Sequence, residues 1–277
     1  MTAAEQTFTF GAGPQSLIGV LHHAQAHGNS RGVVVVVGGP QYRVGSHRQF
    51  VLLARALAQR GIPTLRFDQT GVGDSGGDPA GFENLEGDLR SAIDELQKHA
   101  PRAQRICVWG LCDGASAALM YAASDPRVDR LILLNPWVRS EGSLAQAYID
   151  NYYRRRLRDP AFWRRVLTNP VVLLRGLLGY ADNRRESGRT AVAPVPAFVE
   201  RMLAGACAFR GRMLIVLSGA DTVAAEFSAL VARHPAWSDS FGRDGVTVLR
   251  IDAANHTFSR RQWRDQVAER SADFVLE

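Results

Sequence analysis

The sequence predicts an α/β fold: a mostly parallel central sheet covered by helices on both faces. Two observations carry this prediction. Short apolar runs rich in β-branched residues alternate with longer segments in which apolar residues recur at helical spacing. The chain also has 277 residues, 46% of them hydrophobic, enough for one large α/β domain with an insertion or for two small domains. Strand–helix alternation over most of this length favours parallel strands joined by crossover helices.

The first elements are all β-forming. The segments at 7–10 (TFTF) and 16–23 (SLIGVLHH) flank a turn-rich connection, which predicts a leading hairpin. The run at 32–39 (GVVVVVGG) is bounded by glycines and predicts a strand buried on both faces. Helical spacing then predicts helices at 47–61, 85–100, 113–125, 222–234 and 257–277. Strands are predicted between them at 62–68, 104–110, 130–135, 211–219 and 245–254.

One segment interrupts this alternation. Between Pro136 and about Gly205 no convincing strand occurs, and the sequence is rich in Arg, Tyr, Trp and Leu. Long structureless loops are rare in compact domains, so we expect a helical insertion of roughly 65 residues. The predicted domains are an α/β core at 1–136 and 206–277 and a helical cap at 137–205.

Composition excludes several classes of function. The formal net charge of +6 comes from 33 basic and 27 acidic residues without a concentrated basic tract, so nucleic acid is not an expected partner. Three cysteines without a CxxC spacing suggest neither a disulfide framework nor a zinc site. The start of the chain does not resemble a signal peptide, and no window is apolar enough for a membrane span. We therefore expect a cytoplasmic protein with no metal, cofactor or transmembrane segment.

The strongest chemical signal is the segment GLCDG, where a predicted strand turns into a predicted helix. A nucleophile on such a turn adopts a strained conformation, and the positions two before and two after it must be small. Gly110 and Gly114 satisfy this requirement around Cys112. The free N–H groups of the helix favour a thiolate, and the Asp113 N–H offers one donor to an oxyanion. The Asp113 carboxylate opposes the thiolate unless it turns away or pairs with an arginine. The alternative is that Cys112 is only a small buried residue between strand and helix.

An elbow nucleophile in this architecture requires an acid and then a histidine after later strands. Asp221 follows the strand at 211–219, and His256 follows the strand at 245–254. Both are predicted at carboxyl ends of strands, where open α/β sheets gather catalytic groups. Each has a structural alternative: Asp221 as the N-cap of the next helix and His256 as an ordinary helix-start residue. Asp252 and Glu226 are rival acids, but the first is close along the chain to His256 and the second falls within a helix.

The loop GGPQYRVGSHR after the first buried strand should supply the second oxyanion donor. Proline has no N–H, so the Gln41 N–H is the first choice and the Gly39 N–H the alternative. Arg43 and His47 either hold this loop or bind an anionic substrate.

These motifs carry a family resemblance. The strand VVVVVGG with its loop, the turn RFDQTGVGDSGG, the elbow, Asp221 and His256 occur in the order seen in the α/β-hydrolase superfamily, which the sequence resembles over nearly its whole length. The strings GGPQYRVGSHR, WGLCDGASA and HTFS are similar to the hydrolase subfamily associated with exosortase A and exopolysaccharide gene clusters. Most of the superfamily has serine at the position of Cys112, whereas the dienelactone hydrolases use a cysteine there.

The resemblance implies a hydrolase that cleaves an ester or thioester through Cys112, His256 and Asp221 by way of an acyl-enzyme. Two alternatives remain: an acyltransferase in exopolysaccharide or lipid assembly, and a non-catalytic ligand-binding module. The insertion occupies the usual position of a lid, and its aromatic residues, Trp137, Tyr152 and Tyr153 among them, either line an acyl pocket or form the core of the lid. Its arginines either bind a phosphate-bearing acyl carrier or cover the outer face of helices.

Overall fold

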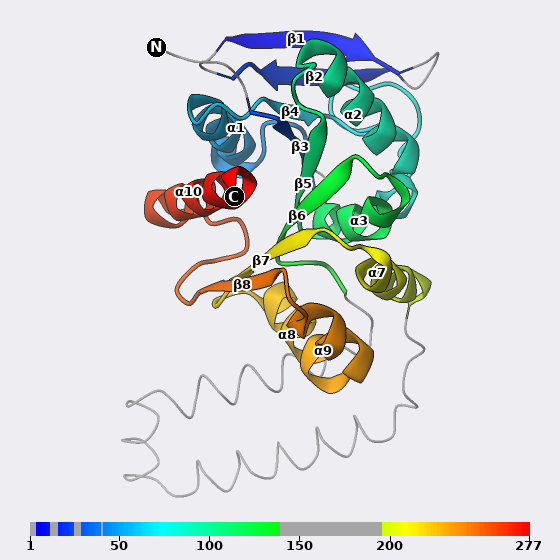
Figure 1. The fold of residues 1–277 in the computed structure, drawn as a ribbon, viewed down its shortest axis with the longest axis vertical. Helices are drawn as coiled ribbons and strands as arrows, with labels where there is room; N and C mark the ends of the chain where they lie inside the picture. Colours follow the sequence, from blue (N-terminus) through cyan, green and yellow to red (C-terminus); the bar gives the residue numbers. More distant parts are fainter. Residues whose placement is uncertain (1–3, 12–15, 25–28, 40, 139–195) are drawn as a thin grey trace, which may run out of the picture.

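The computed structural model describes residues 4–11, 16–24, 29–39, 41–138 and 196–277. Within these residues, Figure 1 shows one twisted sheet with helices on both faces. The strands are β1 (Glu5–Phe10), β2 (Leu17–His22), β3 (Arg31–Val36), β4 (Thr64–Phe67), β5 (Arg105–Leu111), β6 (Val128–Leu134), β7 (Arg212–Ser218) and β8 (Val246–Ile251). The helices are α1 (Gln49–Gln59), α2 (Glu86–His99), α3 (Asp113–Tyr121), α7 (Ala197–Ala208), α8 (Thr222–Arg233), α9 (Pro235–Gly242) and α10 (Arg261–Leu276). Short 3₁₀ turns occupy Ser46–Arg48, Phe82–Asn84 and Ala122–Ser124.

The sheet order is β1-β2-β4-β3-β5-β6-β7-β8. From β4 to β8 every neighbouring pair is parallel, whereas β1 pairs with β2, and β2 with β4, in antiparallel fashion. The predicted leading hairpin and the mostly parallel sheet are therefore both confirmed. Parallel pairing aligns the carboxyl ends of β5, β6, β7 and β8 along one edge of the sheet, where open α/β folds place their ligands.

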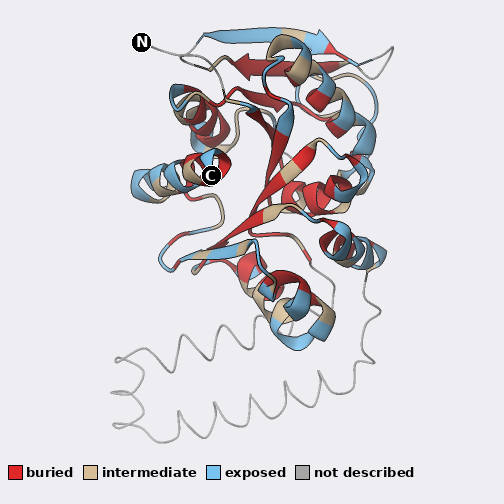
Figure 2. Cartoon of the chain, in the orientation of Figure 1, coloured by how far each residue is buried: buried red, intermediate tan, exposed pale blue. Residues whose placement is uncertain are grey.

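Two hydrophobic cores sandwich the sheet, because successive side chains along a strand point to opposite faces. In β3, Val34 and Val36 pack into the core beneath α2, α3 and α7, while Val33 and Val35 pack beneath α1 and α10. Figure 2 shows the central strands buried, whereas the edge strands β1 and β8 are largely exposed. The buried valine run in the sequence therefore reflects burial on both faces of a parallel sheet.

The structure adds or alters several elements. Helix α9, which begins with a proline in its first turn, was not expected from the pattern. Helix α7 begins in the range assigned to the cap and ends in the range assigned to the core. It packs on α3, and its buried residues Val199 and Met202 belong to the main core. The helix predicted at 257–277 begins only at Arg261, because residues 255–259 form a turn in which Phe258 has a φ of 51°. The rest of the predicted cap, residues 139–195, lies outside the described residues.

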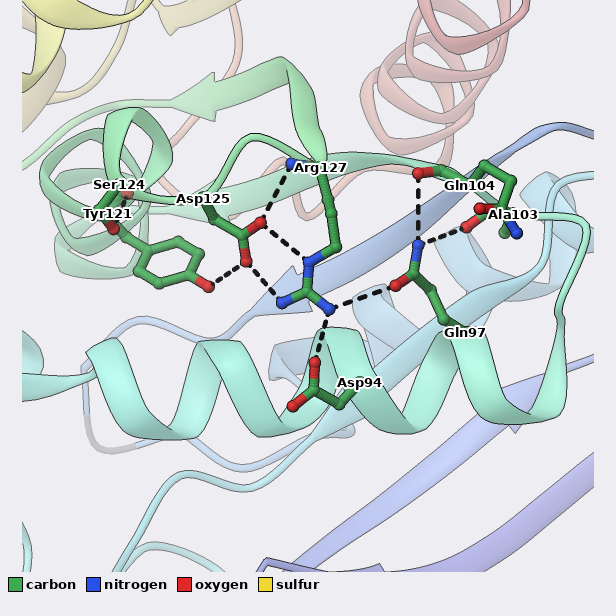
Figure 3. A network of polar contacts seen from close by, with 8 residues as sticks. All are labelled: Asp94, Gln97, Ala103, Gln104, Tyr121, Ser124, Asp125 and Arg127. Atoms are coloured by element: carbon green, nitrogen blue, oxygen red, sulfur yellow. Dashed lines mark hydrogen bonds and ion pairs between the residues drawn. The ribbon is translucent and has the colours of Figure 1, made fainter.

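A polar network joins α2 to the end of α3 (Figure 3). The Arg127 guanidinium donates to both carboxylate oxygens of Asp125, at 2.9 and 2.7 Å, and also to Asp94 and Gln97 on α2. The Tyr121 hydroxyl donates to Asp125 at 2.6 Å. Burial of Asp125 opposes its ionisation, but the hydrogen bonds from Arg127 and Tyr121 outweigh burial and lower the pKa of Asp125 to about 2.

We expect Arg127→Met to lower the free energy of unfolding by about 2 kcal/mol, because it leaves the buried Asp125 carboxylate without its charged partner. The lowered pKa of Asp125 means that this stabilisation is present above about pH 4 and is lost as the pH falls toward 2. Urea unfolding at pH 7 measures the loss. The matched control is Arg105→Met, whose side chain is 66% exposed and for which we expect a change below about 0.5 kcal/mol. Equal effects of the two substitutions would contradict this account of the network.

Candidate active site at the carboxyl edge of the sheet

Cys112 occupies the sharp turn between β5 and α3. Its backbone has a φ of 60° and a ψ of −127°, a conformation that a residue with a side chain adopts only at a cost of about 1–3 kcal/mol. A Cβ atom on Gly110 would lie 2.5 Å from the Gly114 carbonyl oxygen, and one on Gly114 would lie 2.6 Å from the Val36 carbonyl oxygen. Both positions therefore require glycine, as expected for the positions that flank an elbow.

The turn is held by backbone hydrogen bonds on both sides. The Cys112 N–H donates to the Leu134 carbonyl at 2.9 Å, which ties the turn to the end of β6. The Cys112 carbonyl accepts from Ala115 at 3.0 Å, within the first turn of α3, and from Trp137 at 3.2 Å. The Cys112 side chain remains half-buried, whereas Cys107, on β5, is fully buried. Of these two cysteines, only Cys112 lies where a substrate can reach it.

Asp221 and His256 come together after the two neighbouring strands β7 and β8. His256 Nδ1 lies 2.8 Å from Asp221 Oδ2. Asp221 is also the N-cap of α8, accepting from Val223 N at 3.4 Å and Ala224 N at 3.2 Å. The capping role and the contact with histidine are thus combined in one carboxylate. The rival Asp252 is exposed in the loop after β8, and Glu226 lies within α8.

His256 interacts with both Asp221 and Cys112. Burial lowers the pKa of His256, but its hydrogen bonds to Asp221 and to Cys112, together with the charges of both groups, outweigh burial and raise the pKa from 6.5 to about 10. Asp221 is largely buried, with 7% of its side chain exposed, whereas 30% of the His256 side chain is exposed. The ring therefore carries a proton at neutral pH, with one partner on each side.

The loop after β3 is held by its own polar residues. Gln41 Oε1 accepts from Ser46 N at 2.9 Å and from Ser46 Oγ at 3.1 Å, so its side chain closes the loop on itself. The Gly39 N–H donates to Asp113 Oδ1 at 2.5 Å. Both candidate donors for an oxyanion belong to this loop, and the Gly39 N–H contacts the side chain of the residue that follows Cys112.

Arg43 links the loop to the turn that follows β4. The Arg43 guanidinium pairs with Asp68 and, at 2.7 Å, with Asp74. The Arg43 backbone N–H donates to Asp68 Oδ1 at 2.6 Å. Of the two roles considered for Arg43, the structure shows the one in which it holds the loop. His47 lies further along in a left-handed backbone conformation, with a φ of 54°. The motif at Asp68 therefore supports the loop through this arginine.

Asn135, directly after β6, is a residue that the sequence reasoning missed. It is fully buried and has a φ of 44°. Its amide nitrogen donates to the His256 carbonyl at 3.0 Å and to Ser218 Oγ at 2.9 Å, and its amide oxygen accepts from Ser218 N at 2.8 Å. Asn135 thereby fastens the histidine loop to the end of β7. The available signal was a polar residue at the carboxyl end of the strand beside the elbow strand.

Only some of the residues expected to contact a substrate lie in the described part of the chain. Trp137 is half-buried and packs against the main core, and its carbonyl accepts from Ser116 Oγ at 2.7 Å. Tyr152, Tyr153 and the arginines of the insertion lie outside the described residues. In the described part of the chain, no cluster of three His, Cys, Asp or Glu side chains is arranged to hold a metal ion. No helix among the described residues is long and apolar enough to cross a bilayer.

The strand order and the strand–turn–helix at Cys112 define an α/β hydrolase. A model of the serine aminopeptidase S33 family matches residues 28–172, just over half of the chain, and the chain belongs to this family. The matched range contains the elbow but ends before Asp221 and His256. This member has cysteine at the elbow of a family named for its serine.

Two curated relatives match shorter stretches. An uncharacterized protein of Pseudomonas aeruginosa is 33% identical over 118 residues, covering 40% of this chain and 31% of the relative. A polyketide transferase of Penicillium is 31% identical over 95 residues, covering 33% of this chain and 32% of the relative. The chain thus spans less than a third of the length of each of these relatives.

Solved structures share the fold across almost the entire chain. An esterase of Pyrococcus furiosus superposes with a TM-score of 0.65 at 15% identity, covering 99% of this chain and 92% of the esterase. An α/β serine hydrolase homologue of Coxiella burnetii gives a TM-score of 0.59 at 17% identity, covering 96% of both chains. The acylaminoacyl peptidase of Pyrococcus horikoshii gives 0.63 at 16% identity, covering all of this chain and 42% of the peptidase. At these identities the likeness concerns the fold alone.

Proposed function

We propose that this hydrolase cleaves an ester or thioester by means of Cys112 as nucleophile, His256 as proton carrier and Asp221 as the residue that positions His256. The observation that carries the proposal is the arrangement of His256, which hydrogen-bonds Asp221 at 2.8 Å on one side and Cys112 at the strained elbow on the other. Acyl transfer requires a nucleophile, a base and an acid that orients the base, each in contact with the next.

In the first half-reaction His256 holds the proton of the Cys112 thiol, and the sulfur attacks the carbonyl carbon of the acyl donor. The carbonyl oxygen gains negative charge, and backbone N–H groups at the elbow stabilise that charge. Collapse of the intermediate expels the alkoxide or thiolate leaving group, which takes the proton from His256. The product is a thioester between the acyl group and Cys112.

In the second half-reaction His256 removes a proton from a water molecule, which attacks the thioester carbonyl. The second tetrahedral intermediate expels the Cys112 thiolate and releases the carboxylic acid, while the proton taken from water stays on His256, as in the free protein. We assign the oxyanion donors to the Asp113 N–H and the Gly39 N–H. Gly39 replaces our first choice from the sequence, Gln41, because the Gly39 N–H reaches an oxygen beside the elbow at 2.5 Å.

Acyl transfer is a second candidate. One of the curated relatives is a polyketide transferase, and a thioester on cysteine passes its acyl group readily to an alcohol or amine. For either reaction we propose a small-molecule ester or thioester as donor, with a phosphate-bearing acyl carrier as one leaving group and exopolysaccharide or lipid assembly as the setting. The sparse, unpaired cysteines fit a reaction in the cytoplasm.

Steady-state turnover of p-nitrophenyl acetate and acetyl-CoA by the wild type, Cys112→Ala and Cys112→Ser tests the proposal. We expect Cys112→Ala to lose about a thousandfold or more in kcat/KM, since it removes the atom that forms the covalent bond. The control is Cys207→Ala, which changes an exposed cysteine on α7. Retention of most of the activity by Cys112→Ala, or an equal loss in the control, would overturn the assignment. Product analysis with added glycerol distinguishes hydrolysis from transfer.

A further inference from the structure

The Asp113 carboxylate lies beside the Gly39 and Asp113 N–H groups, which are the donors that an oxyanion would need. Gly39 N donates to Asp113 Oδ1 at 2.5 Å. The N–H groups of Gly114 and of Asp113 itself lie near the same carboxylate and favour its ionised form. Of the two donors that the proposed function assigns to the oxyanion, the Gly39 N–H is thus already bound to a carboxylate oxygen of this chain, and the Asp113 N–H lies near the same carboxylate.

The loop is shaped around this carboxylate. A Cβ atom on Gly38 would lie 2.5 Å from Asp113 Oδ1 and 2.1 Å from the Leu111 carbonyl oxygen. Position 38 therefore has to be glycine, because a Cβ atom there would overlap both the end of β5 and the Asp113 carboxylate. The amino end of α3, with its partial positive charge, attracts the carboxylate to the same place.

From this geometry we propose that the Asp113 carboxylate occupies the oxyanion hole of the free protein, and that acylation of Cys112 requires its displacement. Asp113 then determines which acyl donors react. An ester oxygen gains negative charge at the position where a carboxylate oxygen now lies, and two negative oxygens repel each other strongly in a half-buried site. This inference rests on the proposed function, because it concerns the same N–H groups and the same nucleophile.

Opposing forces make the displacement reversible. Burial raises the pKa of Asp113 above its usual range, and the bond from Gly39, the N–H groups of Gly114 and Asp113 and the charge of His256 offset only part of that rise. A donor with a large leaving group gains binding energy away from the reacting carbon, and that energy can offset the cost of moving the carboxylate. A small ester has no such contacts. We therefore expect Asp113 to favour donors carried on a large group over small esters.

Two reactions of Cys112 separate this effect from a general effect of charge. Acylation by p-nitrophenyl acetate passes through an oxyanion, whereas alkylation by iodoacetamide does not. Asp113→Asn keeps the shape and removes the charge, and Asp113→Ala empties the site. The matched control is Asp252→Asn, which removes an exposed carboxylate from the loop after β8. Thermal unfolding establishes that each variant is folded.

We expect both Asp113 variants to be acylated at least about tenfold faster than the wild type, while alkylation changes by less than about threefold and the control resembles the wild type. We also expect the preference for acetyl-CoA over p-nitrophenyl acetate to shrink. Acylation that is unchanged or slower, in a wild type that does react, would overturn the proposal and leave the proposed function standing. An equal rise in both reactions would also overturn it, since Asp113 would then act on the sulfur. Alkylation of Cys112 without acylation in any variant would remove the proposed function as well.

Discussion

Replacement of His256 by glutamine is expected to slow acylation of Cys112 by about a thousandfold or more. Glutamine keeps a polar side chain of similar length but cannot carry the proton between Cys112, the leaving group and water. In the structure His256 contacts both Asp221 and Cys112, so its loss breaks the chain of proton transfer at its centre. Single-turnover kinetics with p-nitrophenyl acetate measure the effect.

The control for this substitution is His234→Gln, which makes the same change at the opposite end of α8 from Asp221. His234 is exposed, and its replacement is expected to leave acylation within about twofold of the wild type. A His256→Gln variant that is acylated at the wild-type rate would remove His256 from the mechanism.

Replacement of Asp221 by asparagine is expected to lower kcat/KM by about a hundredfold or more, with little loss of stability. Asparagine is a good N-cap, so its single amide oxygen still accepts one of the two bonds that Asp221 Oδ1 and Oδ2 accept from Val223 and Ala224. It has no charge to stabilise protonated His256, and its amide no longer selects the ring orientation that acyl transfer needs. Asp221→Ala should lose the same activity and, in addition, about 1 kcal/mol of stability from the missing cap. Activity that falls only in the alanine variant would make Asp221 a capping residue alone.

The same pair gives a pH dependence of stability. The pKa of His256 is raised from 6.5 to about 10 in the folded protein, so the native state binds a proton more tightly than the unfolded chain does. The resulting stabilisation is fully present below about pH 6.5 and is lost as the pH rises toward 10. In Asp221→Asn the main cause of the raised pKa is gone, so we expect denaturation midpoints between pH 6.5 and 10 to fall less steeply than in the wild type. Identical slopes would contradict the His256–Asp221 contact as the source.

The fold was predictable because its signals are local. The valine run of β3 and the alternating helices follow from burial on two faces of a parallel sheet, and the residues of the elbow follow from sterics around Cys112. Helices α7 and α9 were less predictable from the sequence. Helix α7 lies in a segment without strands that resembled the rest of the insertion, and its packing on α3 depends on residues distant in the chain.

The polar contacts of the site were less predictable. The order of Cys112, Asp221 and His256 along the chain indicated that they meet, but the N-cap and histidine-binding roles of Asp221 appeared as alternatives until the geometry combined them. From the sequence, the Asp113 carboxylate opposes the thiolate unless it turns away or pairs with an arginine. The carboxylate instead binds backbone N–H groups, which are identical at every residue and leave no trace in the sequence. Asn135 acts through a backbone carbonyl and was missed for the same reason.

In the proposed mechanism Cys112 forms a covalent bond with the acyl group of the substrate. Intact-protein mass spectrometry of the wild type and Cys112→Ala, after brief mixing with p-nitrophenyl acetate, detects that bond. We expect the wild type to gain one acetyl group, located by peptide mapping on Cys112, which is lost as product appears, and the variant to gain none. A wild type that releases product without an adduct on Cys112, or an adduct that persists in the variant, would contradict it.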